Sequence, residues 1–399
     1  MSHALIVEAL RSPRGRGNDK GALRNLKPVD LLAQQLQALA SRTALQTSDV
    51  NDVYIGCVTQ TADQGANIAK LSLIKAGWDD SVPGMSINRY CASGLSAVHM
   101  AAQQAMTYDS LAVGGGIEMM SRVPMASDRG PLTHDFEFQM QTGLIPIGIA
   151  ADVIATQEGF TRQQCDDYAL ASQQRALAAR DRGPTRALTD VRDEAGEVLL
   201  AQDETPRANT SLASLAAIQP AFAVMAEKYG IDKLMCKRYG LPHIEYVQHA
   251  GNSPAMADGA SAVLVASPGA AARAGLKARG KILATATVSA DRTLALTGAV
   301  QATQQALARA NLKVADIDLF EVNESFASLM LHYMKHLHVP HHKLNVNGGA
   351  IALGHAMGST GSALVGMALD ELERNDQRLA VVALCGAAGL AVAMVIERI

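Results

Sequence analysis

The sequence predicts an α/β fold that consists of two similar halves separated by an inserted segment. Strands alternate with helices over residues 1–118 and again over the last third of the chain, and the turns with candidate functional residues fall at corresponding points of both halves. Such alternation is typical of parallel sheets covered by helices. Two matching halves indicate a duplicated module packed about a pseudo-twofold axis. Residues 119–250 lack the alternation and are predicted to be a loop domain that covers an active site.

Hydrophobic periodicity and turn residues define the elements of the first half. The helix over 29–42 is expected because its apolar residues fall on one helical face. The expected elements are a strand at 3–10 (HALIVEAL), the helix at 29–42, strands at 52–58 (DVYIGCV) and 84–88 (GMSIN), a helix at 91–106 (CASGLSAVHMAAQQAM) and a strand at 111–121 (LAVGGGIEMMS).

The last third repeats this order. NLKVADIDLFEV matches ALQTSDVNDVYIG, so that Asp316-Ile317-Asp318 align with Asp49-Val50-Asn51. The expected elements are a strand at 281–290, a helix at 299–310, KLNVN before a glycine-rich turn, a helix at 359–372 and the closing stretch AVVALCGAAGLAVAMVIER. The boundaries follow: 1–118 plus 251–275 form the first half, 119–250 the loop domain and 276–399 the second half.

Proline, glycine, aspartate and arginine are frequent in the insert, which also contains one clear helix start. Thr161-Arg-Gln-Gln164 has the pattern of a capping box. We expect a polar helix after it that turns Cys165, Tyr168, Ser172 and Ala176 inward.

Composition excludes several classes of function. The 399 residues hold 35 Lys and Arg against 38 Asp and Glu, a formal net charge of −3. A near-neutral chain gives no electrostatic reason to expect nucleic acid or an anionic membrane as a partner. The five cysteines are odd in number and form no CxxC pair, so neither a disulfide framework nor a zinc site is expected. Reduced thiols favour a cytoplasmic protein.

Two stretches bear on targeting. The amino terminus lacks a basic start and has Glu8 within its only apolar run, so no signal peptide is expected. Residues 379–396 carry no charge and reach the length of a membrane span. Because Gly386 and Gly389 interrupt this run, we expect two buried strands around a CGAAG turn and no membrane segment.

Cys91 and His355 are the first candidates for chemistry. Cys91 ends a short strand, opens a helix and precedes small residues, and a helix N-terminus favours the thiolate. The alternative is a buried structural cysteine. His355 lies in GGAIALGHAMGSTG, where a histidine held in a tight turn can act as a base for a thiol. This stretch has neither the Rossmann spacing nor a GK[ST] phosphate loop, and a turn histidine without a role is its alternative reading.

Cys385 and Asn323 are the second pair of candidates. Cys385 follows the apolar run VVAL and is expected to point from a buried strand end into a cleft, although a core thiol is the alternative. Asn323 begins NESFA at the end of another strand, where sites of α/β proteins gather. An amide there can hold a water or donate to an oxyanion, and Glu324 can orient a side chain. Four such residues at the strand ends of one duplicated core favour an active site.

The motifs NRYCASG, GGGIEMMSR, AGNSPAMADGA, VNESFA, GGAIALGHAMGSTG and CGAAG occur in this order and span essentially the whole chain. This set resembles the thiolase family, the acetyl-CoA C-acyltransferases. The resemblance implies a five-layered αβαβα core from two duplicated halves, a loop domain that binds coenzyme A, and a homodimer or homotetramer. It also implies that coenzyme A is a substrate and that no cofactor or metal is bound permanently.

The resemblance assigns roles to the candidates. Cys91 is the nucleophile that carries the acyl group, His355 the base that activates it, and Cys385 the acid and base at the α-carbon of the acetyl unit. Asn323 holds the water that forms one oxyanion hole with Nε2 of His355. The backbone N–H groups of Cys91 and Ala387 form the other.

The resemblance also implies substrate contacts. Coenzyme A contacts are expected at Arg207, Ser214, Phe222, Ala250 and Phe326. Pro146 and Ile147 line the acyl pocket, where short-chain relatives carry a His-Met pair.

Three features depart from the family pattern. Ala387 stands where the family has glycine, so its N–H can donate only if its φ is negative. Pro254 replaces a serine that contacts pantetheine. Residues 223–249 are longer than in short-chain relatives, and their basic residues either meet a phosphate or form a solvated face; these are Lys228, Lys233, Lys237 and Arg238.

We therefore expect a degradative thiolase, which cleaves a 3-oxoacyl-CoA with coenzyme A to acetyl-CoA and a shortened acyl-CoA, in the breakdown of fatty or other acyl chains. The first alternative is a biosynthetic acetoacetyl-CoA thiolase. A ketoacyl synthase is more remote, because Cys385 argues against its Cys and two His or His and Asn site. A non-catalytic acyl-CoA-binding relative would lack the nucleophile.

Overall fold

The computed structural model describes residues 3–399, in which ten strands form one continuous mixed sheet with the order β10-β11-β12-β9-β1-β8-β5-β3-β4 and β2 paired to β8. The strands of the first half are β1 (Ala4–Arg11), β2 (Gly15–Arg16), β3 (Val50–Gly56), β4 (Gly84–Ile87), β5 (Leu111–Met119) and β8 (Ala257–Ala266). Those of the second half are β9 (Gly280–Ser289), β10 (Leu319–Val322), β11 (Leu379–Cys385) and β12 (Leu390–Arg398). The two halves join where β1 pairs with β9.

The strand order confirms the duplication. The neighbours β1-β8-β5-β3 recur as β9-β12-β11-β10, with the same antiparallel and parallel pairings. A short 3₁₀ turn precedes both β3 and β10, at Thr47–Asp49 and Val314–Asp316, as the matched sequences predict. The counterpart of β4 is reduced to a single parallel bridge between Phe320 and Leu344, because KLNVN follows a 3₁₀ turn and does not extend into a strand.

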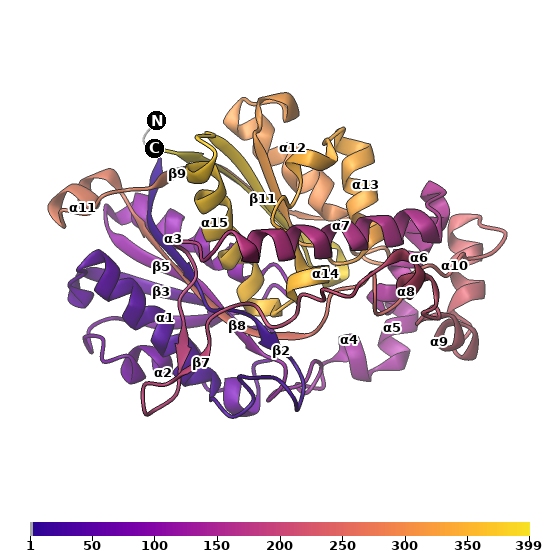
Figure 1. The fold of residues 1–399 in the computed structure, drawn as a ribbon, viewed down its shortest axis with the longest axis horizontal. Helices are drawn as coiled ribbons and strands as arrows, with labels where there is room; N and C mark the ends of the chain where they lie inside the picture. Colours follow the sequence, from indigo (N-terminus) through magenta and orange to yellow (C-terminus); the bar gives the residue numbers. More distant parts are fainter. Residues whose placement is uncertain (1–2) are drawn as a thin grey trace.

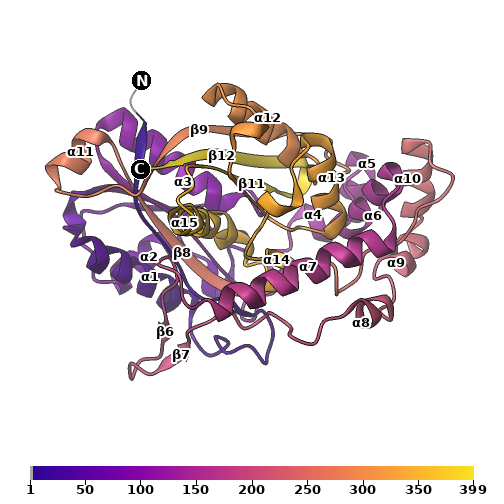
Figure 2. The same ribbon diagram turned by 45° about the horizontal axis from the view of Figure 1, so that its top comes forward.

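Helices cover the sheet on its outer faces and fill the space between the halves. Helices α1 (Pro28–Thr43) and α2 (Ile68–Lys75) cover the first half, and α12 (Gly298–Ala310) and α13 (Ala327–Leu337) cover the second. Helices α3 (Ser93–Tyr108) and α15 (Met357–Arg374) pack together in the middle (Figure 2). The shorter helices α11 (Pro268–Arg273) and α14 (Ala350–Leu353) complete the halves. Three buried clusters, two outer and one central, correspond to the expected five αβαβα layers.

Glycine lets the two central helices approach each other at their N-terminal ends. A Cβ on Gly94 of α3 would lie 2.6 Å from the carbonyl oxygen of Gly358 in α15. A Cβ on Gly116 of β5 would lie 2.0 Å from the same oxygen. Since no side chain fits at such distances, these positions require glycine, and the first turns of α3 and α15 are held in direct backbone contact.

The insert contains mostly helices. Its elements are α4 (Pro131–His134), α5 (Phe136–Thr142), α6 (Ile147–Glu158), α7 (Arg162–Asp181), β6 (Val191–Arg192), β7 (Val198–Leu200), α8 (Leu212–Ala216), α9 (Ala223–Lys228) and α10 (Ile231–Tyr239). Most of its helices gather at one end of the molecule, and α7 runs from there along the second half (Figure 1). The capping box at Thr161 and Gln164 is present, and the four residues predicted to face inward are buried. The exact domain boundaries stay a prediction.

Two apolar stretches meet the length of a membrane span. Residues 379–396 form β11 and β12 around the CGAAG turn, as predicted. The stretch from Phe136 to Glu158 also passes by length and hydropathy, but 56% of its apolar window is buried inside the protein. Because α5 ends at Thr142 and α6 begins at Ile147, this stretch is not one continuous helix. Its buried part, α6, is a helix of the protein core.

Candidate active site

The duplicated core places the candidate residues at corresponding positions of the two halves. Cys91 and His355 each lie two residues before the first residue of a central helix, α3 and α15. Asn323 is the first residue after β10, as Cys57 is after β3. The strand registers, Gly56 opposite Gly116 and Val322 opposite Ala383, align Cys385 with Glu118.

Cys91 lies between β4 and α3. The strand expected before it ends at Ile87, four residues before Cys91. Its side chain is half-buried, whereas Cys385 is 1% exposed. Burial raises the pKa of the Cys91 thiol to about 12, and the nearby Cys385 and Glu118 raise it further. Burial therefore acts against the helix N-terminus, which was expected to favour the thiolate, and a thiol with a raised pKa needs a base.

His355 is a neutral base. Its Nδ1 lies 2.8 Å from Oγ1 of Thr360, which donates its own proton to the carbonyl oxygen of Ala356 at 2.9 Å. Nδ1–H is therefore the donor of the pair, and Nε2 carries the lone pair. Nε2 is buried without a hydrogen-bond partner among residues 3–399. Burial, with a smaller effect from the Arg14 guanidinium, lowers the pKa of His355 to about 3.

The backbone fixes the position of the histidine. The N–H of His355 donates to the carbonyl oxygen of Ala255 at 2.8 Å, and Nη1 of Arg14 donates to that of Gly354 at 2.9 Å. Gly354 has a φ of +83°, which glycine adopts without strain. These hydrogen bonds attach the loop to Arg14, which follows β1, and to the segment before β8. The loop itself leads into α15.

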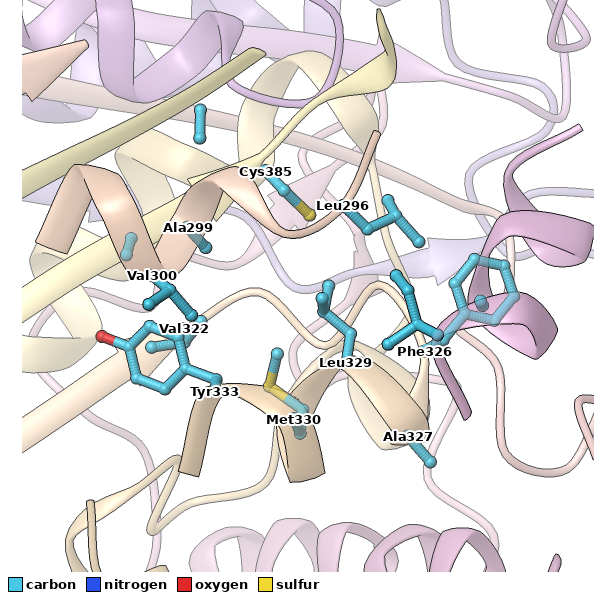
Figure 3. Close-up of a cluster of buried hydrophobic side chains, with 14 of the residues drawn as sticks. Leu296, Ala299, Val300, Val322, Phe326, Ala327, Leu329, Met330, Tyr333 and Cys385 are labelled. Carbon is cyan, nitrogen blue, oxygen red and sulfur yellow. The ribbon is translucent and has the colours of Figure 1, made fainter. Parts of the chain in front are cut away.

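Asn323, Ser325 and Cys385 form a hydrogen-bonded chain. Nδ2 of Asn323 lies 3.0 Å from Oγ of Ser325, which lies 3.1 Å from Sγ of Cys385. Oδ1 of Asn323 is buried without a partner in the described part of the chain. Burial raises the pKa of Cys385 to about 11, while the Ser325 hydroxyl lowers it. In Figure 3 the Cys385 side chain points from the strand end towards Leu296, at the rim of the outer core of the second half.

The two unpartnered atoms are informative. A buried polar atom without a hydrogen bond costs about 1–3 kcal/mol, so such an atom is suited to bind a water or a substrate group. Nε2 of His355 and Oδ1 of Asn323 are such atoms, and both belong to predicted site residues. Oδ1 of Asn323 can accept one proton of a water, and the second proton of that water is then free to point elsewhere. The role that the resemblance implies for Asn323 needs such an acceptor.

The CGAAG turn meets the condition set for Ala387. The non-glycine residue with a positive φ in this turn is Ala388, at 56°, and Ala387 is not in that region. The N–H of Ala387 makes no hydrogen bond to any of residues 3–399. It is free to donate to an oxyanion.

Glu324 accepts hydrogen bonds from several segments around the site. Its buried carboxylate accepts hydrogen bonds from the hydroxyls of Tyr168 and Ser172 at 2.8 and 2.7 Å, and from the amide of Asn345 and the N–H of Ile351. It orients these groups, as expected, and joins α7 of the insert to the second half. Thr360, Ser325 and Arg14 were not predicted as site residues. Their closeness to a candidate in sequence was the available signal for Ser325 and Thr360.

Four residues predicted to contact the substrate lie close together. A Cβ on Gly148 would lie 2.0 Å from the ring of Phe222, so this ring covers the first turn of α6 beside Ile147. Phe222 also packs edge-on against Phe326, with ring centroids 6.2 Å apart. Ile147 and Phe222 border the core that contains Phe326, and Pro146 precedes α6. The residues expected to line the acyl pocket thus lie next to part of the residues expected to contact coenzyme A.

The remaining predicted contacts lie at the surface. Arg207, Ser214 and Ala250 are exposed. Ser214 is engaged in the capping box of α8 with Ser211. The longer segment 223–249 contains α9 and α10, and its four basic side chains are exposed, in agreement with either reading.

Comparison with known proteins gives the family. The thiolase N-terminal domain matches residues 4–227, and the thiolase C-terminal domain matches residues 276–398. The chain is 36% identical to a 3-ketoacyl-CoA thiolase of Serratia proteamaculans, 34% to one of Yersinia pestis and 35% to one of Aliivibrio fischeri, in each case over 100% of both chains. The chain belongs to the thiolase family.

Proposed function

We propose that this protein is a degradative thiolase that cleaves a 3-oxoacyl-CoA with coenzyme A. The observation that carries the proposal is that two thiols, one from each half, come together: a Cβ on Gly386, next to Cys385, would lie 3.2 Å from the carbonyl oxygen of Arg89, two residues before Cys91, and Cys385 raises the pKa of Cys91. A neutral histidine with a free Nε2 completes the set. Full-length relatives named 3-ketoacyl-CoA thiolase support the direction of the reaction.

The first half-reaction uses both thiols. Nε2 of His355 takes the Cys91 proton, and the thiolate attacks the ketone carbon C3 of the substrate. The C2–C3 bond then breaks, the electron pair moves to the acetyl-CoA enolate, and Cys385 protonates C2. The acyl group remains on Cys91 as a thioester.

Stabilisation of negative charge makes the leaving group possible. We assign the enolate oxygen to the hole formed by protonated Nε2 of His355 and a water on Asn323. We assign the tetrahedral oxygen on C3 to the N–H groups of Cys91 and Ala387. The thiol of coenzyme A then gives its proton to the Cys385 thiolate, and the resulting thiolate displaces Cys91, which takes back the proton held on Nε2 of His355; the product is the shortened acyl-CoA.

The substrate surface extends from this centre. We propose that the coenzyme crosses Phe222 and Phe326 towards the exposed Arg207, Ser214 and Ala250, and that the acyl chain passes Pro146 and Ile147. Coenzyme A is then a substrate, and the reaction needs no bound cofactor. We also propose a homodimer or homotetramer, and a cytoplasmic location because all five cysteines are free thiols.

The proposal is tested by mass spectrometry of the protein mixed with an acyl-CoA donor. The added acyl group is expected on the Cys91 peptide, and Cys91→Ser is expected to lose nearly all turnover because a hydroxyl ionises far less than a thiol. Cys236→Ser, at a half-buried thiol on α10, is the control for substitution of a cysteine. A label on Cys385 alone contradicts the assignment.

The biosynthetic alternative is separated by substrate length. Ile147 lacks the length of the methionine in short-chain relatives, and Pro146 cannot donate a hydrogen bond. We expect a higher kcat/KM for a medium, long or ring-bearing 3-oxoacyl-CoA than for acetoacetyl-CoA, by roughly tenfold or more, since one methylene is worth about 1–3 kcal/mol. A clear preference for acetoacetyl-CoA contradicts the degradative reading and leaves the roles of the thiols unchanged.

A further inference from the structure

Two histidines and a glutamate converge at the end of the molecule that carries α6 and α13, apart from the residues assigned to catalysis. His332 and His336 are four residues apart on α13, so they share one face of that helix. Nδ1 of His332 lies 2.9 Å, and Nε2 of His336 2.7 Å, from the same oxygen, Oε1 of Glu158. The three ligand atoms lie within 4.8 Å of one another.

This arrangement has the donors and the spacing of a divalent metal site. Two histidines at i and i+4 of a helix with one carboxylate are a recurrent ligand set for first-row metals. Metal–ligand bonds of about 2.0–2.2 Å in tetrahedral geometry separate ligand atoms by about 3.3 Å. The present separations of 2.7–2.9 Å therefore need to open by only a few tenths of an ångström, which small side-chain rotations supply.

Access and charge have opposite effects on such a site. The side chains of Glu158, His332 and His336 are 16%, 11% and 44% exposed, so the ligands are held in place while water can fill a fourth position. Lys335 lies 2.7 Å from Oε2 of Glu158 and is the nearest cation. It binds the other carboxylate oxygen, which leaves Oε1 to a metal, but its charge opposes a second cation.

We propose that Glu158, His332 and His336 bind one divalent transition-metal ion of the zinc class, with water as the fourth ligand. The ion joins the last turn of α6 in the insert to α13 in the second half. These helices run in the same direction, and Oγ of Ser328 donates to the carbonyl oxygen of Ala151 between their earlier turns. Their N-terminal ends lie at Ile147 and next to Phe326, so the metal holds together the helix that borders the proposed acyl pocket and the helix that borders the proposed coenzyme surface.

The test titrates the chelator-treated full-length protein with Co²⁺ and with Zn²⁺. We expect one Co²⁺ per chain with visible ligand-field bands of a tetrahedral N/O site and without the thiolate charge-transfer bands that a cysteine would give. Zn²⁺ is expected to displace Co²⁺ and to raise the unfolding temperature as its concentration rises.

Substitutions make the test specific. His336→Ala is expected to weaken Co²⁺ binding at least tenfold. His243→Ala is the matched control, because His243 is an exposed histidine 2.6 Å from Glu245 without a second histidine nearby. Lys335→Gln is expected to tighten binding about fivefold, since removal of a charge a few ångströms away favours a cation.

The last variant separates metal binding from a structural hydrogen-bond cluster. Loss of Lys335 weakens such a cluster, whereas it strengthens a metal site. Absence of Co²⁺ binding by the unmodified protein overturns the proposal, as does unchanged binding by His336→Ala. Thiolate bands that persist in His336→Ala assign the metal to a cysteine and equally overturn it.

Discussion

Ser325→Ala tests how the protein controls the proposed acid. The Ser325 hydroxyl lies 3.1 Å from Sγ of Cys385 and lowers the pKa of that thiol, which burial has raised to about 11. Without the hydroxyl, the Cys385 thiolate loses its one side-chain donor, and its pKa rises. Removal of a proton from the α-carbon of acetyl-CoA by Cys385 thiolate then becomes slower, since less thiolate is present.

The magnitude follows from the kind of hydrogen bond that is lost. A hydrogen bond to a charged group is worth about 1.5–3 kcal/mol, which corresponds to a tenfold to hundredfold change in the thiolate fraction. The substitution also leaves Nδ2 of Asn323 without its partner at 3.0 Å. We expect this second effect to lower the free energy of unfolding by about 1–3 kcal/mol.

The assay follows exchange of deuterium from the acetyl group of labelled acetyl-CoA in water, together with acylation of Cys91. Exchange is expected to fall at least tenfold in Ser325→Ala, while acylation by an acyl-CoA donor stays near its original rate. Ser328→Ala is the matched control, because its buried hydroxyl donates only to the carbonyl oxygen of Ala151. Unchanged exchange, or equal loss of exchange and acylation, refutes the reasoning and makes Ser325 a structural residue.

Two further predictions concern a base and a buried acid. Thr360→Val removes the acceptor of Nδ1–H of His355 and is expected to slow alkylation of Cys91 and turnover on the order of tenfold; unchanged values for both would show that packing alone orients the ring. Burial raises the pKa of Asp152 to about 7, so the folded state keeps a proton that the unfolded state loses near pH 4, and stability falls as pH rises from about 4 to 7. Asp152→Asn is expected to remove this fall, with a gain of at most about 4 kcal/mol at pH 8 and little at pH 4 in urea unfolding; an equal effect at both pH values contradicts the assignment.

The sequence predicts most of the scaffold because its signals are local. Alternating strands and helices, the match between the stretches around Asp49 and Asp316, and the capping box at Thr161 each depend on neighbours in the chain. The paired strands after Leu379 follow from glycines that interrupt an apolar run. These elements are confirmed with ends shifted by a few residues, where side-chain and backbone hydrogen bonds compete.

What the sequence could not predict depends on contacts between distant segments. The helix N-terminus before Ser93 suggested a thiolate at Cys91, but packing of the two halves places the half-buried thiol near Cys385, and burial and Cys385 both raise its pKa. The metal ligands Glu158 and His332 are 174 residues apart, so only the spacing of the histidines on α13 was visible in the chain.

The duplication also explains why one core has one catalytic centre. Cys385 and Glu118 occupy matching strand positions, but Glu118 is a carboxylate that accepts the N–H of Gly358 at 3.0 Å in the first turn of α15. Its other hydrogen bonds come from the N–H groups of Val58 and Thr59 and from Nε2 of Gln64, so this half uses the position to close a helix terminus. At the matching position of the second half stands the smaller, uncharged thiol of Cys385. The N–H of Gly94, in the first turn of α3, therefore has no acceptor among residues 3–399. The helix end next to Cys91 therefore stays open to negative charge that develops on a substrate, while its counterpart is already neutralised.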